Sequence, residues 1–351
     1  MMGEFSKKVL SWFTNHGRRD LPWQKNPTAY RVWISEIMLQ QTQVATVIPY
    51  FERFMDSFPD VQTLALADID QVLHHWTGLG YYARARNLYK TANLIVDDYN
   101  SKLPANVERL SELPGIGKST AGAIVAIAYN RPASILDGNV KRVLTRVFGV
   151  EGWPEQAQVK TRLWQIAEAQ TPDSRVADYT QAMMDLGATV CTRSNPRCQD
   201  CPLAQTCIAF QSDTVDLYPG RKPKKSLPVK QVAMFMLQNK HNEVLLQKRP
   251  PTGIWGSLWS FPEAANVADQ PDLLDTSIEI ESVSKWPEIR HTFSHYHLDI
   301  TPVHEIITTR KNTVMDTDLW LWYPLNNPLE IGLAAPVKKL LTQLAQQSGN
   351  L

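Results

Sequence analysis

The sequence predicts a two-domain protein in which an all-α domain is followed by a smaller α+β domain. Its length of 351 residues suits about two domains, and its 43% hydrophobic content is ample for packed cores. The apolar residues follow helical spacing in the first part of the chain and strand-like alternation in the last part. A proline-rich basic segment lies where the pattern changes, and it marks the domain boundary.

Residues 1–212 are expected to form the all-α domain. Apolar residues recur there at three- and four-residue intervals, the period of a helix with one buried face. Asp68 and Ser119 are the start signals in this region and are expected to act as N-caps. The predicted helices cover residues 5–13, 30–54, 64–75, 83–99, 119–129, 138–148, 159–169 and 178–190.

Residues 213–230 contain three prolines and a basic run without apolar periodicity, so a linker is expected. Residues 231–351 form the predicted second domain. Short strand-like runs at 232–237, 244–246 and 295–300 are separated by turn residues, and the tail at 336–347 returns to a helical pattern.

The formal net charge of +1 neither requires nor excludes a nucleic-acid partner, because binding needs a local basic patch. No apolar stretch reaches membrane-spanning length, and residues 1–8 lack a signal-peptide core. We therefore expect a cytoplasmic protein in a reducing compartment, without a membrane partner.

The four cysteines of the chain fall within one 17-residue window, at Cys191, Cys198, Cys201 and Cys207. Such clustering predicts a metal site, since a disulfide framework would spread its cysteines and need an oxidising compartment. The spacing differs from the paired pattern of common zinc sites and suits a [4Fe–4S] cluster. A structural zinc site with four cysteine ligands is the alternative.

Residues 113–123 combine glycines with the start of a predicted helix. Gly115 and Gly117 permit a tight turn, and the free N–H groups at the helix start can bind a phosphate, with Lys118 and Ser119 directly behind them. This pattern favours a helix–hairpin–helix that grips the DNA backbone without reading its sequence. A dinucleotide-binding turn is disfavoured, because no strand precedes it.

Two carboxylates have the sequence surroundings that glycosidic bond cleavage needs. Glu36 lies among apolar residues of a predicted helix, where burial would raise its pKa and make it a general acid. Asp137 precedes a glycine at a predicted helix start, a position that favours the ionised form. A protonated and an ionised carboxylate together can cleave a glycosidic bond through a sugar cation. The alternatives are a surface glutamate and a simple N-cap aspartate.

Residues 78–86 hold two glycines, two tyrosines and two arginines. An aromatic side chain inserted beside a base can unstack it, so Tyr81 is a candidate DNA wedge. The alternative is ordinary tyrosine packing at a helix end.

Together these motifs closely resemble the MutY adenine DNA glycosylases, within the helix–hairpin–helix superfamily that includes endonuclease III. The resemblance covers nearly the whole chain. The matching segments are residues 21–23, 33–44, 78–87, 113–124, 136–143, 181–191, 253–262 and 291–300, together with the cysteine spacing.

The resemblance implies a [4Fe–4S] cluster and removal of adenine flipped out of a mispair with 8-oxoguanine or guanine in double-stranded DNA. Glu36 would protonate adenine at N7, and Asp137, with Asn139 beside it, would stabilise or trap the sugar cation. Arg19, Leu21, Trp23 and Gln181 would line the adenine pocket. Gln40, Gln41 and Tyr81 would contact DNA beside 8-oxoguanine.

Endonuclease III carries a nucleophilic lysine at the position of Ser119, whereas here the nearest hairpin lysine is Lys118. One residue turns a side chain about 100° around a helix, so Lys118 should point out of the pocket. A Schiff-base lyase needs its amine in the pocket. We therefore expect a glycosylase without strong lyase activity, in which Lys141 forms at most an incidental adduct.

The second domain resembles the Nudix fold but lacks the glutamate cluster that holds metal in working Nudix hydrolases. By resemblance it recognises 8-oxoguanine through Phe293, Ser294 and His295. The expected protein is a nucleoid-associated monomer. The remaining alternatives are an endonuclease III-like glycosylase/lyase acting on oxidised pyrimidines, and a non-catalytic iron–sulfur protein.

Overall fold

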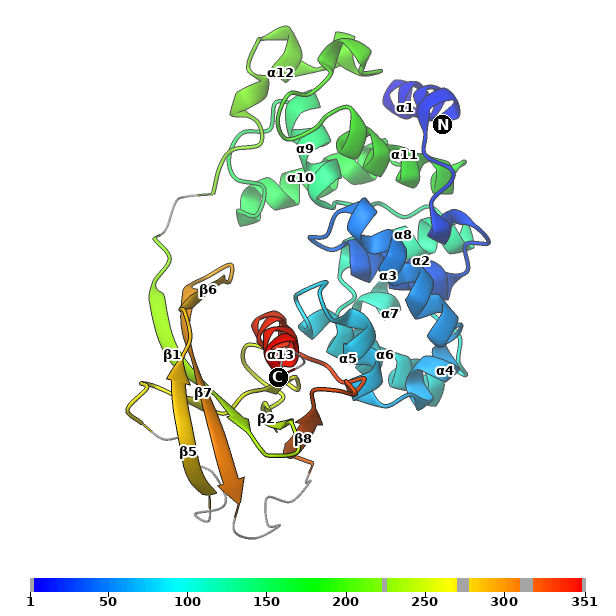
Figure 1. The fold of residues 1–351 in the computed structure, drawn as a ribbon. Coiled ribbons are helices and arrows are strands. Elements are labelled where there is room, and N and C mark those ends of the chain that lie inside the picture. The colour runs from blue at the N-terminus through cyan, green and yellow to red at the C-terminus, as the bar shows by residue number, and fades with distance from the viewer. Residues whose placement is uncertain (1–2, 223–225, 270–277, 310–317, 349–351) are drawn as a thin grey trace. The chain divides into compact units, whose positions relative to one another are not determined.

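The computed structural model describes residues 3–222, 226–269, 278–309 and 318–348 (Figure 1). The chain divides into two compact units, a helical unit and a sheet unit. The helical unit comprises residues 1–66 and 87–224. The sheet unit comprises residues 225–351 and also residues 67–86, which the sequence places among the helices of the first domain.

The helical unit is built from helices that each bury apolar side chains. A cluster of buried side chains joins the first helix to the helices around residues 140–190, and the fully buried Leu144 and Leu186 lie in it. Its main helices are α1 (Glu4–His16), α2 (Ala29–Leu39), α3 (Val44–Ser57), α4 (Val61–Leu66), α6 (Ala83–Asp98), α7 (Val107–Ser111), α8 (Lys118–Tyr129), α9 (Gly138–Val147), α10 (Ala157–Gln170), α11 (Val176–Thr189) and α12 (Ile208–Gln211). Short 3-10 turns lie at Pro22–Gln24, Cys198–Asp200, Ala204–Thr206 and Val215–Leu217.

The predicted helices are confirmed in kind, but two of them are interrupted. The one expected at 64–75 is divided at residues 67–68 into α4 and α5 (Ile69–Trp76). The one expected at 30–54 is interrupted as well. It ends at Leu39 as α2 and resumes at Val44 as α3. Gln41 between them has a φ of 57°, in the left-handed region that a continuing helix cannot use. Apolar periodicity alone did not reveal this break, which turns Gln40 and Gln41 toward a cavity.

Of the two predicted N-caps, Asp68 is confirmed and Ser119 is wrong. The Asp68 carboxylate accepts a hydrogen bond from the Asp70 amide of α5 (Ile69–Trp76). Helix α8 begins one residue earlier than expected, with Gly117 at the cap position. The Ser119 hydroxyl instead accepts a hydrogen bond from the Leu136 amide at 2.9 Å, and so ties α8 to the segment that precedes α9.

The first residues of the expected linker pack on the helical unit. Arg146 donates to the Tyr218 carbonyl at 3.0 Å, and Gly220 lies so close to Gly152 that a Cβ would come within 2.5 Å of the Gly152 oxygen. Residues 223–225, the end of the expected basic run, lie outside the described residues. The last two residues of the expected linker already belong to a strand.

In the described residues of the sheet unit, eight strands form one mixed sheet with the order β3-β2-β1-β7-β5. Strands β1 and β7 run parallel, and β5, β6, β2 and β8 add antiparallel pairs (Figure 1). The buried core under β1 includes Phe235, Leu237 and Val303. The elements are β1 (Val229–Gln238), β2 (Glu243–Lys248), β3 (Trp259–Ser260), β4 (Glu263–Ala264), β5 (Ile278–Lys285), β6 (Ile289–Thr292), β7 (His297–Thr309), β8 (Trp320–Pro324) and α13 (Ala335–Ser348).

Helix α5 and the turn after it complete the sheet unit. Val72, Leu73 and Trp76 of α5 are fully buried. None of the described helices combines the length and the apolar character that crossing a bilayer requires.

Candidate active site

A broad cavity of ≈ 910 Å³ in the helical unit gathers most of the residues expected to act on DNA. Glu36 reaches it from α2 and Asp137 from the N-terminus of α9, although about 100 residues separate them in sequence. Other expected residues on its wall are Leu21, Trp23, Gln40, Gln41, Ser119, Asn139, Lys141 and Gln181. The fold therefore brings the two carboxylates to one space.

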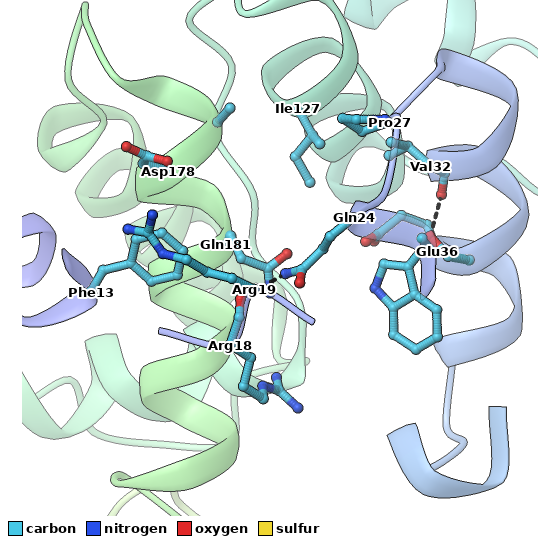
Figure 2. A pocket seen from close by; sticks show the side chains of 13 residues that line it. Phe13, Arg18, Arg19, Gln24, Pro27, Val32, Glu36, Ile127, Asp178 and Gln181 are labelled. Carbon is cyan, nitrogen blue, oxygen red and sulfur yellow. Dashed lines mark hydrogen bonds between the residues drawn. The ribbon is translucent and has the colours of Figure 1, made fainter. Parts of the chain in front are cut away.

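A narrower pocket of ≈ 210 Å³ shares Glu36 with this cavity and is lined by Arg18, Arg19, Trp23 and Gln181. Figure 2 shows Arg18, Arg19 and Gln181 on one side of the pocket and Glu36 on the other, with Gln24 between them. Drug-sized ligands occupy pockets of roughly 300–1,000 Å³, so this volume suits a smaller group such as one nucleobase.

Glu36 has the environment of a general acid. It follows the buried run Val32–Ser35 on α2 and is itself only partly exposed, where it borders the cavity. Burial, with a smaller contribution from the negative charge of Asp137, raises the pKa of Glu36 to about 8. Glu36 therefore keeps its proton at neutral pH.

Asp137 is the N-cap of α9, and its Oδ1 accepts a hydrogen bond from the Val140 amide at 2.8 Å. The helix terminus favours the ionised form of Asp137 as expected, but burial outweighs it and raises the pKa of Asp137 above its ordinary value. The amides of Val140 and Asn139 and the cations Arg142 and Lys141 oppose that rise. The negative charge of Asp137 is in turn one of the causes that raise the pKa of Glu36.

A chain of hydrogen bonds supports Asp137 from behind. Asn139 Nδ2 donates to Asp137 Oδ2 at 3.3 Å, and Arg142 Nη2 donates to Asn139 Oδ1 at 2.8 Å. Arg142 also donates to the backbone carbonyls of Gly187 and Cys191 at 2.6 and 2.7 Å. The carboxylate is therefore oriented by a network that extends to the first cysteine.

Gln181 is held by a buried carboxylate that the sequence pattern did not single out. Asp185 is fully buried and lies one helical turn after Gln181 on α11. It accepts the Gln181 amide nitrogen at 2.9 Å and three hydrogen bonds from Arg18 at 2.7–3.0 Å. An ionised carboxylate can only accept, so the Gln181 NH₂ group faces Asp185 and its carbonyl oxygen is turned away from it.

The two lysines near the hairpin have different surroundings. Lys118 forms an exposed ion pair with Glu168 at 2.8 Å and lies 4.3 Å from the Trp164 ring centroid. Lys141 lies on the wall of the broad cavity and pairs with Glu155 at 2.5 Å. Ser119, not Lys118, lines the cavity.

The four cysteines line one small cavity, formed by their own loop and α9. Burial raises the pKa of the Cys198, Cys201 and Cys207 thiols, that of Cys201 to about 12, and neighbouring thiolates add to the rise. Within the described residues, no group of three or more His, Cys, Asp or Glu side chains is arranged to hold a single metal ion. Arg146 donates to Cys191 Sγ at 3.4 Å.

Of the residues expected beside 8-oxoguanine, Gln40 and Gln41 lie in the helical unit, whereas Tyr81 and residues 293–295 lie in the sheet unit. We call residues 78–82 the wedge turn and residues 293–296 the reading hairpin. In the wedge turn Tyr81 has a φ of 49° and is 50% exposed. The reading hairpin joins β6 to β7, with the Phe293 amide donating to the Tyr296 carbonyl at 2.9 Å. Ser294 and His295 are exposed at its tip.

Sequence reasoning missed the buried or supporting polar residues. These are Arg18, Arg142, Glu155 and Asp185. Of these, only Asp185 could have been found from the sequence. It lies among the apolar positions of a predicted helix, where an unpaired charge would be costly, so a partner could have been expected.

Both parts of the chain are similar to known protein families. Residues 34–169 match the HhH-GPD superfamily of base excision DNA repair proteins, and residues 233–343 match the NUDIX domain family. The structure of a thermostable thymine-DNA glycosylase aligns with a TM-score of 0.54 and 26% identity, over 59% of this chain and 95% of that one. An endonuclease III–DNA complex aligns with a TM-score of 0.50 and 22% identity, over 59% and 94%, a likeness of fold alone. The fold and the two family matches define a DNA N-glycosylase of the helix–hairpin–helix class, extended by a Nudix-like domain.

Sequence relatives show to which family within this class the chain belongs. The adenine DNA glycosylase of Buchnera aphidicola subsp. Acyrthosiphon pisum is 40% identical over 96% of each chain. The human adenine DNA glycosylase is 33% identical over 84% of this chain and 65% of its own length, and the mouse one is 33% identical over 84% and 69%. The chain belongs to the adenine DNA glycosylase family of base excision repair enzymes.

Proposed function

We propose that this enzyme binds duplex DNA, flips adenine out of a mispair with 8-oxoguanine or guanine, and hydrolyses its N-glycosidic bond without cutting the backbone. The observation that carries the proposal is the convergence of Glu36 and Asp137 on one cavity, with a base-sized pocket beside Glu36. Membership of the adenine DNA glycosylase family supports adenine as the base removed.

The first step is a proton transfer to the leaving base. Glu36, protonated at neutral pH, donates its proton to adenine N7, and the electron pair of the C1′–N9 bond leaves with the base. A neutral adenine is a better leaving group than an adenine anion. The raised pKa keeps Glu36 protonated, and so able to convert adenine into this better leaving group.

The sugar is left with a positive charge at C1′, which the Asp137 carboxylate stabilises or traps. Asn139 and Arg142 hold the carboxylate in place. Water then attacks C1′ and passes a proton to Glu36, which regenerates the acid and leaves an abasic site. Because extrusion costs a few kcal/mol and less at a mismatch, mispaired adenine is favoured over paired adenine.

The narrow pocket provides a way to recognise adenine. Because Asp185 holds the Gln181 amide nitrogen, the Gln181 oxygen is available to accept a hydrogen bond from the exocyclic amino group of adenine. A 6-oxo purine would place an acceptor against that oxygen. Arg19, Trp23 and Leu21 complete the expected wall of the adenine site.

Two features support a glycosylase without strong lyase activity. Lys118 is engaged by Glu168 on the surface, and the hairpin residue on the cavity wall is a serine. Lys141 does border the cavity, but its amine is engaged in an ion pair with Glu155 that it would have to leave before it could attack the abasic aldehyde. Strong β-elimination that survives Lys141→Ala would contradict this part of the proposal.

Opposite the adenine, we propose that Ser294 in the reading hairpin contacts 8-oxoguanine while Tyr81 and Gln40 fill space in the duplex. A hydroxyl both donates and accepts, which suits a base whose N7 is a donor and whose C8 carries an acceptor. Gly115, Gly117 and Lys118 would hold a phosphate at the start of α8.

We also propose that the four cysteines hold a [4Fe–4S] cluster. The thiols surround a shared cavity, which suits a multi-atom cluster better than one zinc ion. Burial raises the pKa values of the Cys198, Cys201 and Cys207 thiols, so positive charge nearby would favour their thiolate forms, and the iron ions of a cluster would supply it. When bound, the cluster would cross-link residues 191–207, where Arg193 is exposed and borders the broad cavity.

The test is adenine release from an 8-oxoguanine·adenine duplex by the wild type, Glu36→Gln and Asp137→Asn. We expect release by the wild type and a loss of at least about 10²-fold in each variant, the size of a general-acid contribution. Undiminished release by both variants would remove the catalytic assignment. Iron content of Cys201→Ser relative to the wild type tests the cluster separately.

A further inference from the structure

The wedge turn is anchored by C-terminal parts of the chain, within the sheet unit. Helix α5, which leads into it, packs Leu73 against Gly332 so tightly that a Cβ on the glycine would lie 2.6 Å from the Leu73 Cβ. Asp70 on α5 accepts hydrogen bonds from Lys248 at 3.0 Å and from the Trp259 indole at 3.4 Å. The Asp70 and Lys248 side chains are only 19% and 24% exposed. This ion pair is therefore shielded from most solvent screening.

Hydrogen bonds hold the wedge turn and the first residues of α6 in place. The buried Tyr82 hydroxyl donates to the Leu333 carbonyl at 3.0 Å and accepts from the Gly78 amide at 3.3 Å. Arg86, at the start of α6, donates from Nη1 to the Gly256 carbonyl at 2.7 Å. Because the guanidinium is charged, its hydrogen bond to the carbonyl oxygen is stronger than one between two neutral groups.

The carbonyl that receives Arg86 belongs to a loop that touches the reading hairpin. Trp255, next to Gly256, packs its ring 5.3 Å from Phe293 and 5.4 Å from His291. Its φ of 52° is unfavourable for a bulky residue, and such a conformation persists only where the surroundings over-determine it. The Arg249 guanidinium also lies over the Trp255 ring, 5.9 Å from its centroid.

A continuous path of contacts thus runs from Arg86 through Gly256 and Trp255 to Phe293. We propose that this path is a rigid link that sets the distance between the wedge at Tyr81 and the reading hairpin, so that both engage the same base opposite the excised adenine. Arg86 and Trp255 are then positioning residues for recognition of the opposite base. The inference rests on the proposed function of these two loops.

The link acts on discrimination and not on the bond-breaking step. 8-Oxoguanine differs from guanine at two atoms, so a hairpin displaced by about 1 Å loses the hydrogen bonds that distinguish them. Guanine cannot form these distinguishing hydrogen bonds, so the rate of adenine release opposite guanine depends less on the position of the hairpin. A weakened link should therefore lower the rate with 8-oxoguanine more than the rate with guanine.

The test uses full-length Arg86→Met, Trp255→Leu and the double variant. Single-turnover adenine release and duplex affinity are measured with 8-oxoguanine and with guanine opposite adenine. Each single variant should reduce the 8-oxoguanine:guanine rate ratio by about tenfold, the value of one charge-assisted hydrogen bond. The double variant should resemble the worse single variant, because both break one path. Trp255→Phe, which keeps an aromatic contact, should preserve the ratio, as should Lys339→Met, a charge-loss control on α13.

An equal loss with both duplexes would overturn the link and indicate a phosphate contact by Arg86. The link would also be overturned if the double variant reduced the rate ratio by the product of the two single reductions. That result would show that Arg86 and Trp255 act independently. Arg86→Lys can still donate to Gly256, so it should restore most of the ratio; thermal melting of every variant identifies any that do not fold. A wild type that does not distinguish the two partners would refute the proposed 8-oxoguanine recognition, which separates that failure from a failure of the link.

Discussion

Replacement of Glu36 by glutamine should make the protein more stable at high pH and leave it nearly unchanged at low pH. Between pH 4.5 and about 8 the folded protein keeps the Glu36 proton while the unfolded chain loses it. The folded state then binds more protons, so the free energy of unfolding falls as pH rises through this window. Glutamine stays neutral and removes the effect.

The size of this effect follows from the interval between the two pKa values. At about 1.36 kcal/mol per pH unit, the span from 4.5 to about 8 sets an upper limit of about 5 kcal/mol. Because Glu36 borders a water-accessible cavity, we expect roughly 2 kcal/mol. For a unit of about 150–250 residues this corresponds to a Tm difference of about 4–8 °C.

The assay is thermal unfolding of the wild type and Glu36→Gln from pH 5 to pH 9, compared as differences so that other titrating groups cancel. Glu112→Gln, an exposed carboxylate after α7, controls for loss of one negative charge. The Tm advantage of Glu36→Gln should grow between pH 5 and pH 8 and then level off. A difference that does not change with pH would refute the assignment of Glu36 as a buried acid.

Three further predictions concern the same cavity. Single-turnover release should fall as pH rises above about 8, because Glu36 then loses the proton that it donates; a rate that keeps rising with pH would contradict this. Asp185→Asn should lower the free energy of unfolding by about 3–5 kcal/mol in denaturant titration, because it leaves Arg18 without its charged partner; a change below about 1 kcal/mol would show the pair to be dispensable. Gly187→Ala should slow adenine release more than it weakens DNA binding, since its Cβ would lie 2.5 Å from the Asn139 Cβ; equal effects on both would contradict a displacement confined to the Asp137 network.

Much of the architecture followed from local patterns. Apolar spacing located the helices around the cavity and three of the eight described strands, β1, β2 and the start of β7, because burial of one face imposes a period of 3.6 or 2 on the sequence. The break at Gln41 and the true cap of α8 were not visible, because a left-handed residue or a displaced serine leaves apolar periodicity unchanged. The grouping of residues 67–86 with the sheet unit had no local signal either.

The sequence alone determined which groups are present: two carboxylates in contrasting local settings, a hairpin without the lyase lysine, four clustered cysteines and a Nudix-like domain without a metal-binding helix. Only the tertiary structure decided how these groups behave. Burial raises the pKa of Asp137 although its helix terminus favours the charge, since desolvation depends on every neighbour and not on local position. The Arg18–Asp185 pair and the Arg86–Trp255 path likewise exist only where distant segments meet.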